Sequence, residues 1–96
     1  MSNMKAELLM RERRVLKAGF IEAIVWRLPE PLRGSTHSLK YRLAYVVESE
    51  CVLRYDNEAG KGDHRHVGTK QMPYVFVSVG QLLDDFLADV ATGKGD

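Results

Sequence analysis

Bulky apolar side chains recur at every second position from residue 40 to residue 47, and this spacing restricts the segment to an extended strand. The apolar residues on one side of that strand are Tyr41, Leu43, Tyr45 and Val47. Arg42 falls on the opposite side, as expected when successive side chains alternate between two faces. Comparable runs predict four further strands, at residues 5–16, 20–28, 51–55 and 74–77.

The connections between these runs are mostly short, which indicates a meander. Lys17-Ala18-Gly19 offers a glycine for a tight hairpin, and Glu48-Ser49-Glu50 forms a second turn. Pro29 ends the strand at residues 20–28, and a polar loop then runs to Ser38. Because short turns join neighbouring strands antiparallel, the sheet is expected to be antiparallel. The strand at 20–28 is apolar on both sides, so it is expected to be central or covered on both faces.

An amphipathic helix is predicted after the last strand. Ser78 and Gln81 have capping-box spacing, and Gly93 ends the apolar pattern. The stripe at helical spacing consists of Val79, Leu82, Leu83, Phe86, Leu87 and Val90. The resulting fold class is α+β, in which a curved antiparallel β-sheet of about five strands, a meander, is covered on one face by a C-terminal α-helix. Residues 1–96 are expected to form a single domain.

Composition places the chain among cytoplasmic globular proteins. The single cysteine, Cys51, excludes an internal disulfide framework and fits a reducing compartment, and we expect it to be buried. The first residues become charged at once, so no signal peptide is predicted. No apolar stretch approaches the roughly 20 residues that span a bilayer, so no membrane association is predicted.

The formal net charge of +1 conceals an asymmetry between the two halves of the chain. Residues 1–45 carry nine Lys and Arg against four Glu, whereas residues 46–96 carry five basic residues against nine acidic ones. Such a division suits a basic surface that binds phosphate or an acidic partner. Uneven scatter of surface charge produces the same pattern, so the asymmetry alone decides nothing.

Residues 55–66 crowd titratable and flexible side chains into what is predicted to be one loop. Two of the three histidines, His64 and His66, lie there two positions apart. If the segment after Asp63 is extended, both imidazoles project from the same face. An ordinary imidazole pKa of about 6.5 lets one ring act as a base and the other as an acid near neutral pH.

This pattern supports a hypothesis of metal-independent RNA cleavage. His64 and His66 would form the acid–base pair, and Asp56 or Asp63 would orient one of the rings. The residues predicted to bind the nucleic acid or stabilise the transition state are Lys61, Arg65, Arg42 and Arg54. Such a mechanism needs no cofactor.

Two other interpretations use the same segment. A mixed set of carboxylates and imidazoles, namely Asp56, Asp63, His64 and His66, also suits a divalent transition-metal ion, in which case the protein would be a metal-dependent phosphodiesterase. In a purely structural role, Asp56 and Asn57 would cap the turn while the histidines satisfied backbone groups. The spacing does not choose among the three.

Other polar and aromatic residues are expected to be structural. Trp26, Tyr41 and Tyr45 are assigned to the core rather than to base stacking. The run Arg11–Arg14 fits a solvated edge strand, whose charges discourage aggregation. The aspartates at 84, 85 and 89 give the helix an acidic side, which we expect to face solvent.

As a whole, the sequence resembles the TumE-like family of bacterial toxin components. The segments that carry the resemblance are 5–9, 24–31, 40–47, 55–58, Gly60-Lys61-Gly62-Asp63-His64-Arg65-His66 and 73–76. The resemblance covers nearly the whole chain, and the residues 60–66 are its most specific part.

The resemblance implies the toxin half of a type II toxin–antitoxin pair, whose partner is a helix-turn-helix antitoxin. Small toxins of this kind commonly act on RNA, which agrees with the basic first half of the chain. The competing class is a non-enzymatic binding module that inhibits its target by occupancy. The sequence does not show whether the edge strands pair into a homodimer.

Overall fold

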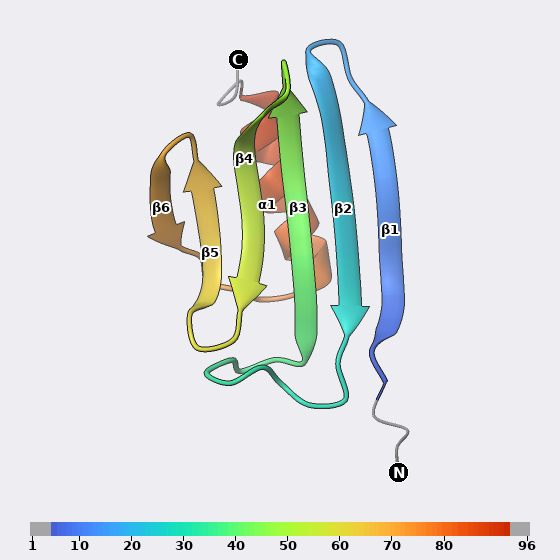
Figure 1. The fold of residues 1–96 in the computed structure, drawn as a ribbon, viewed down its shortest axis with the longest axis vertical. Coiled ribbons are helices and arrows are strands. Elements are labelled where there is room, and N and C mark those ends of the chain that lie inside the picture. Colours follow the sequence, from blue (N-terminus) through green and yellow to red (C-terminus); the bar gives the residue numbers. More distant parts are fainter. Residues whose placement is uncertain (1–4, 93–96) are drawn as a thin grey trace.

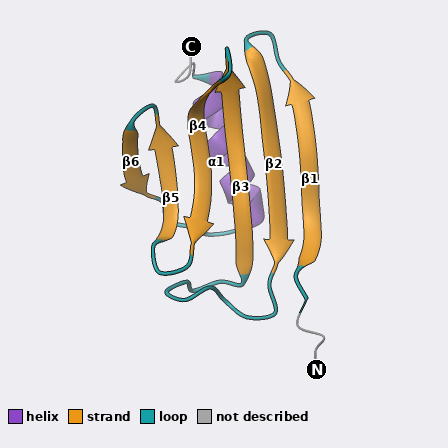
Figure 2. Ribbon diagram, in the orientation of Figure 1, coloured by secondary structure: helices purple, strands orange, loops and turns teal. Residues whose placement is uncertain are grey.

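A computed structural model describes residues 5–92, which form one antiparallel sheet with a helix behind it (Figures 1 and 2). The strands follow one another across the sheet in the order β1-β2-β3-β4-β5-β6. They are β1 (Glu7–Val15), β2 (Gly19–Arg27), β3 (Leu39–Val47), β4 (Glu50–Glu58), β5 (Gly62–Val67) and β6 (Lys70–Pro73), and the helix is α1 (Val79–Ala91). The predicted α+β meander is therefore confirmed, with six strands instead of about five.

The predicted long loop at residues 55–66 is in fact a β-hairpin. β4 continues to Glu58, and β5 pairs with it antiparallel from Gly62 onward. Gly60 and Gly62 adopt φ values of 81° and 78°, which glycine adopts without steric cost, so the chain reverses within a few residues. The sequence pattern did not reveal β5, because charged and histidine side chains occupy most of its positions and turn-forming residues precede it.

The strand predicted at residues 74–77 is wrong. The last strand is the earlier segment Lys70–Pro73, and Pro73 ends it instead of beginning it. A proline is tolerated there because β6 is an edge strand, so one side of its backbone needs no partner in the sheet. The residues after Pro73 lead directly to the helix.

The core lies between α1 and one face of the sheet. Leu82 and Phe86 of the helix are buried against that face. The buried strand residues around them are Val25, Tyr41, Leu43, Tyr45, Leu53 and Tyr55. Tyr41 and Tyr45 are therefore core residues as predicted. The long strands meet the helix on only one side, because α1 lies behind the sheet (Figure 1).

Two predictions of burial are wrong, for different reasons. Trp26 neighbours the inward-facing Val25 and therefore points away from the helix, where it is only half-buried. Cys51 is exposed, since it follows the β3–β4 turn and lies beside an irregularity in the pairing. β2 is central, as expected, but α1 covers one of its faces and not both.

The β1–β2 and β3–β4 connections depend on backbone features that the sequence pattern did not predict. Gly19 begins β2, and a Cβ atom there would lie 1.9 Å from the Val46 carbonyl oxygen, so glycine is required by a close backbone approach. The β3–β4 turn places Glu48 and Ser49 at φ values of 51° and 67°. Both residues occupy the left-handed region that a two-residue hairpin demands and that usually selects Asn or Gly.

Helix α1 begins as predicted. Ser78 is the N-cap, and its hydroxyl accepts a hydrogen bond from the Gln81 N–H at 3.1 Å. The Gln81 side chain bonds Asp85 at 2.7 Å and does not complete the capping box. The predicted helix end at Gly93 lies outside the described residues. Within the part that is described, no helix has the length and apolarity needed to cross a membrane.

The aspartates of α1 are not simply solvated, which corrects the expectation for two of them. Asp85 accepts a hydrogen bond from the Tyr74 hydroxyl at 2.6 Å. Asp89 accepts one from the Tyr55 hydroxyl at 2.6 Å. Asp84 is exposed. The acidic side of the helix therefore docks it onto the sheet and the segment before α1.

Candidate functional site

The register of the sheet assigns side chains to its two faces. Directly opposed residues of antiparallel strands point to the same side, and successive residues alternate. Val25, Tyr41 and Tyr55 face α1. The next residue in each strand, Trp26, Arg42 or Asp56, therefore faces away, toward the viewer in Figure 1. We call the side opposite α1 the open face.

Five predicted site residues gather on the open face. They are Arg42, Arg54, Asp56, His64 and His66, and we call them the open-face cluster. Asp56 lies opposite Arg42 on one side and opposite His64 on the other. Arg54 lies opposite His66. Three neighbouring strands therefore hold the cluster, and regular pairing fixes the position of each side chain.

Direct contacts connect three members of the cluster. The Arg54 Nε atom lies 3.2 Å from Asp56 Oδ2, although this buried nitrogen makes no hydrogen bond, so the contact is ionic. The Arg54 Nη2 atom lies 3.2 Å from His66 Nε2. The same imidazole nitrogen lies 3.4 Å from Asp56 Oδ1. His66 is thus placed between a cation and an anion.

This placement offers His66 a partner in either protonation state. An unprotonated Nε2 accepts a hydrogen bond from Arg54, whereas a protonated Nε2 faces the Asp56 carboxylate. The His64 and His66 ring centroids are 6.3 Å apart, and their planes are inclined at 49°. The side chains of Asp56 and His66 remain 18% and 23% exposed, so solutes can reach them.

A hollow of about 490 Å³ extends the open face from the cluster toward β1. Arg11 and Arg13 of β1 and Arg42 of β3 line it, together with Glu22 and Ile24 of β2. Glu12 and Ala23 complete the lining, but their side chains point toward α1. Three guanidinium groups therefore face a single carboxylate side chain, that of Glu22, which makes the hollow basic. Three of the nine basic residues in the first half of the chain therefore lie on the same face as the histidines.

Three predicted site residues lie elsewhere. Asp63 and Arg65 point toward α1, because they alternate with His64 and His66 along β5. Arg65 donates a hydrogen bond to Asp89 at 2.8 Å. Lys61 is exposed in the β4–β5 turn, where its Nζ atom lies 3.6 Å from a Glu58 oxygen. The structure does not bring these three residues into the open-face cluster.

The four residues of the proposed metal set are also divided. Asp56, His64 and His66 lie on the open face, whereas Asp63 lies on the helix side. Within residues 5–92, no group of three or more His, Cys, Asp or Glu side chains has an arrangement that would hold a metal ion. The predicted set therefore does not converge on one point.

Asp63 instead forms a network with His37, a residue that sequence reasoning passed over. His37 Nε2 lies 2.9 Å from Asp63 Oδ2, and the Tyr41 hydroxyl donates to the same oxygen at 2.6 Å. Burial, and then the hydrogen bond to Asp63, raise the pKa of Tyr41 well above its ordinary value. Twenty-six residues separate His37 from Asp63, so no local pattern announces the contact.

The His37 network is structural in character. The His37 Nδ1 atom accepts a hydrogen bond from the Leu39 N–H at 3.2 Å, so Nε2 carries the ring proton and donates the hydrogen bond to Asp63. The His37 ring also packs against Phe76, with centroids 4.1 Å apart. The side chains of His37 and Asp63 are each only 12% exposed. This network fastens the β2–β3 loop to β5 and leaves the open face free.

The family model described as Toxin TumE matches residues 5–93, which is nearly the whole chain. No curated protein and no solved structure matches the chain.

Proposed function

Because the chain belongs to the TumE toxin family, we propose that it exerts its toxicity as a metal-independent ribonuclease. The observation that carries this proposal is the pair of imidazoles on one side of β5, 6.3 Å apart between centroids, beside a carboxylate and two guanidinium groups. Rings this close can contact the same phosphodiester group, since each catalytic contact spans about 3 Å.

In the proposed reaction, His66 acts as the base and His64 as the acid. When Nε2 of His66 donates to Asp56, Nδ1 carries the lone pair that removes the proton of a ribose 2′-hydroxyl. The 2′-oxygen attacks phosphorus and the bond to the 5′-oxygen breaks. His64 gives its proton to that leaving oxygen. The products are a 2′,3′-cyclic phosphate and a 5′-hydroxyl end.

The other cluster members stabilise charge in this scheme. Asp56 orients His66 and stabilises its imidazolium form. Arg54 and Arg42 face the negative charge that builds on the phosphoryl oxygens. Proton transfer by a positioned imidazole contributes about 10²–10⁴-fold to a rate. DNA lacks the 2′-hydroxyl nucleophile, so it is not a substrate.

The basic hollow and Trp26 extend the proposed RNA surface. Arg11, Arg13 and Arg42 would bind successive phosphates, and the half-buried Trp26 presents an indole for stacking. Adjacent strands are about 4.8 Å apart, so the sheet is wide enough for several nucleotides to cross β1 to β5. We further propose that the protein acts in the cytoplasm and that a helix-turn-helix antitoxin neutralises it.

The test measures cleavage of a labelled single-stranded RNA and of its 2′-deoxy counterpart by purified variants. His64→Ala and His66→Ala are expected to lose about 10²–10⁴-fold in rate while keeping the thermal unfolding midpoint. Lys61→Ala is the matched control, because it removes an exposed cation of the same hairpin from outside the cluster. Cleavage should persist with a chelator present.

Two outcomes would overturn the mechanism. Histidine variants that bind RNA normally and remain toxic in cells would identify an inhibitor that acts by occupancy. Activity that chelation abolishes and added metal restores would identify a metal-dependent phosphodiesterase.

A further inference from the structure

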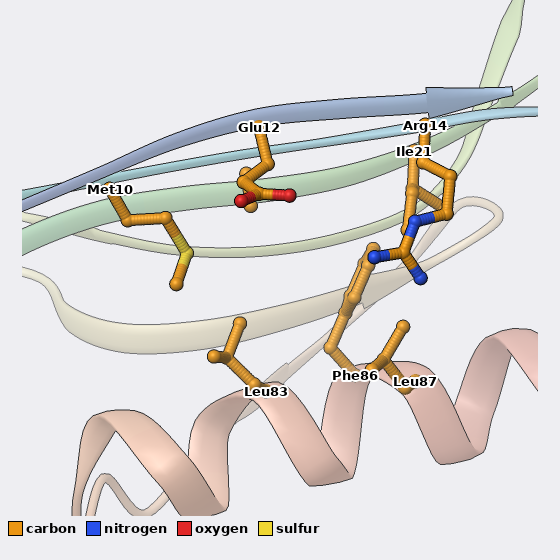
Figure 3. A pocket seen from close by; sticks show the side chains of 8 residues that line it. Met10, Glu12, Arg14, Ile21, Leu83, Phe86 and Leu87 are labelled. Carbon is orange, nitrogen blue, oxygen red and sulfur yellow. The ribbon is translucent and has the colours of Figure 1, made fainter.

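A second surface lies on the helix side of the sheet, where β1 and β2 overhang α1. A groove of about 250 Å³ opens there (Figure 3). Its lining consists of Met10, Glu12, Arg14, Ile21, Ala23, Leu83, Phe86 and Leu87. The strand side chains point down and the leucines of α1 point up, leaving an apolar slot between them. Glu12 and Arg14 supply its charged groups.

The groove adjoins a free sheet edge. In the described residues, β1 pairs only with β2, so its outer backbone donors and acceptors have no strand partner. Leucines are unusually exposed along this border: Leu8, Leu9 and Leu87 are 44%, 41% and 42% exposed. An edge of this length with apolar residues beside it is a template for another strand.

The charges of this edge select the kind of strand that fits. Arg11, Arg13 and Arg14 outnumber Glu12 at the centre of β1. Arg13 has partners, since its guanidinium covers the Phe20 ring at 4.1 Å and lies 3.7 Å from Glu22. Arg11 and Arg14 have no carboxylate within ion-pair distance among residues 5–92. The edge therefore favours acidic side chains on an added strand.

A second copy of this chain fits poorly. Two-fold antiparallel pairing of β1 with itself keeps the two open faces on the same side of the sheet. In the central registers it places Arg11 opposite Arg11, Arg11 opposite Arg13, or Arg13 opposite Arg13, and only the last of these registers offsets the repulsion by placing Glu12 opposite Arg14. Like charges directly opposite one another destabilise a strand pair. An acidic partner avoids this repulsion.

We propose that the outer edge of β1 and the groove bind an extended acidic segment of the antitoxin, which adds a seventh strand to the sheet. The identity of the partner rests on the proposed function; the chemistry of the segment rests on the edge itself. Alternate positions of the segment carry apolar side chains, and one acidic side chain opposite Arg14, into the groove, and acidic side chains over Arg11 on the open face. The acidic side chains would compete there with RNA phosphates in the basic hollow, which gives neutralisation a physical basis.

The test uses the full chain and the protein encoded by the adjacent reading frame, with affinity measured by calorimetry. Leu87→Asp and Arg14→Glu, which lie outside the RNA surface, are expected to weaken binding at least tenfold, whereas RNA cleavage by the free variants stays unchanged. The matched control is Val77→Asp, which introduces the same charge at an apolar residue that is 71% exposed away from the groove. Glu12→Gln should bind as well as the original chain or better.

Hydrogen exchange tests the strand addition separately. Complex formation should slow amide exchange in the β1 peptide, residues 7–15, and leave that of the opposite edge, β6, unchanged. Tight binding that Leu87→Asp and Arg14→Glu do not weaken would refute this inference while leaving the toxin–antitoxin pairing intact. A stable dimer of the isolated chain that Leu87→Asp dissociates would show that a second copy occupies the edge. Absence of any binding by the neighbouring protein would overturn the pairing itself, and with it this assignment, whatever the outcome of the cleavage assay.

Discussion

The hydroxyl of Tyr55 supplies the sharpest test of how α1 is held against the sheet. Tyr55 is 1% exposed in β4, and its hydroxyl donates to Asp89 at 2.6 Å. Tyr55→Phe removes only this group, because the ring keeps its edge-on packing against Phe86 and Tyr74. A hydrogen bond to a charged partner contributes about 1.5–3 kcal/mol. Asp89 retains Arg65 at 2.8 Å, so no isolated charge is left behind and the expected loss is about 2 kcal/mol.

Chemical denaturation measures this loss, and a thermal scan should show the midpoint lower by about 8–16 °C for a chain of this size. Asp84→Asn is the control, since this exposed carboxylate of the same helix should change the free energy of unfolding by less than about 0.5 kcal/mol. A double-mutant cycle with Asp89→Ala should show strong non-additivity. If Tyr55→Phe proves as mild as the control, or if the two changes add, the hydroxyl does not hold the helix and the account of the docking is wrong.

Three further predictions concern the stability of the fold. Burial, and then the hydrogen bond to Asp89, raise the pKa of Tyr55 to about 12. Because the folded state favours the neutral hydroxyl, its contribution to the free energy of unfolding is complete below about pH 10 and is lost between about pH 10 and 12. Urea midpoints across that range should therefore fall more in the original chain than in Tyr55→Phe. The Asn57 side chain is 1% exposed, donates to the Leu39 carbonyl and accepts from the Tyr41 N–H. Asn57→Ala should therefore lower the free energy of unfolding by about 2–4 kcal/mol. A loss below about 1 kcal/mol would contradict this prediction. Ser49→Gly relieves a φ of 67° and should raise the unfolding free energy by about 0.5–1 kcal/mol in the same assay, whereas a decrease would show that the turn is unstrained.

The sequence predicted the elements whose burial is periodic. β3 and α1 place apolar residues at a spacing of two and of three to four, because each buries one face against the other, and both were recognised near their observed limits. β5 escaped prediction since charged and histidine side chains occupy most of its positions. The last strand was predicted after Pro73 and not before it, because a proline is as compatible with the end of an edge strand as with its beginning.

Contacts between distant residues explain what sequence reasoning missed at the site. The partners of His37 and Tyr55 lie 26 and 34 residues away, and only the folded sheet brings them together. Spacing did identify His64 and His66 as neighbours on one face, conditional on an extended backbone. It gave no means of deciding which of the surrounding charges shared that face, because this depends on the register between β4 and β5.

That register divides the charged hairpin into two sets with different roles. The odd-numbered residues Asp63 and Arg65 face α1, where they bind His37 and Asp89 and hold loop and helix to the sheet. The even-numbered residues His64 and His66 face outward beside Arg54 and Asp56. A shift of pairing by one residue would bury both imidazoles and expose the structural pairs. The ion pair between Arg65 and the helix therefore fixes which side chains the open face presents, so stability and the proposed chemistry depend on the same alternation.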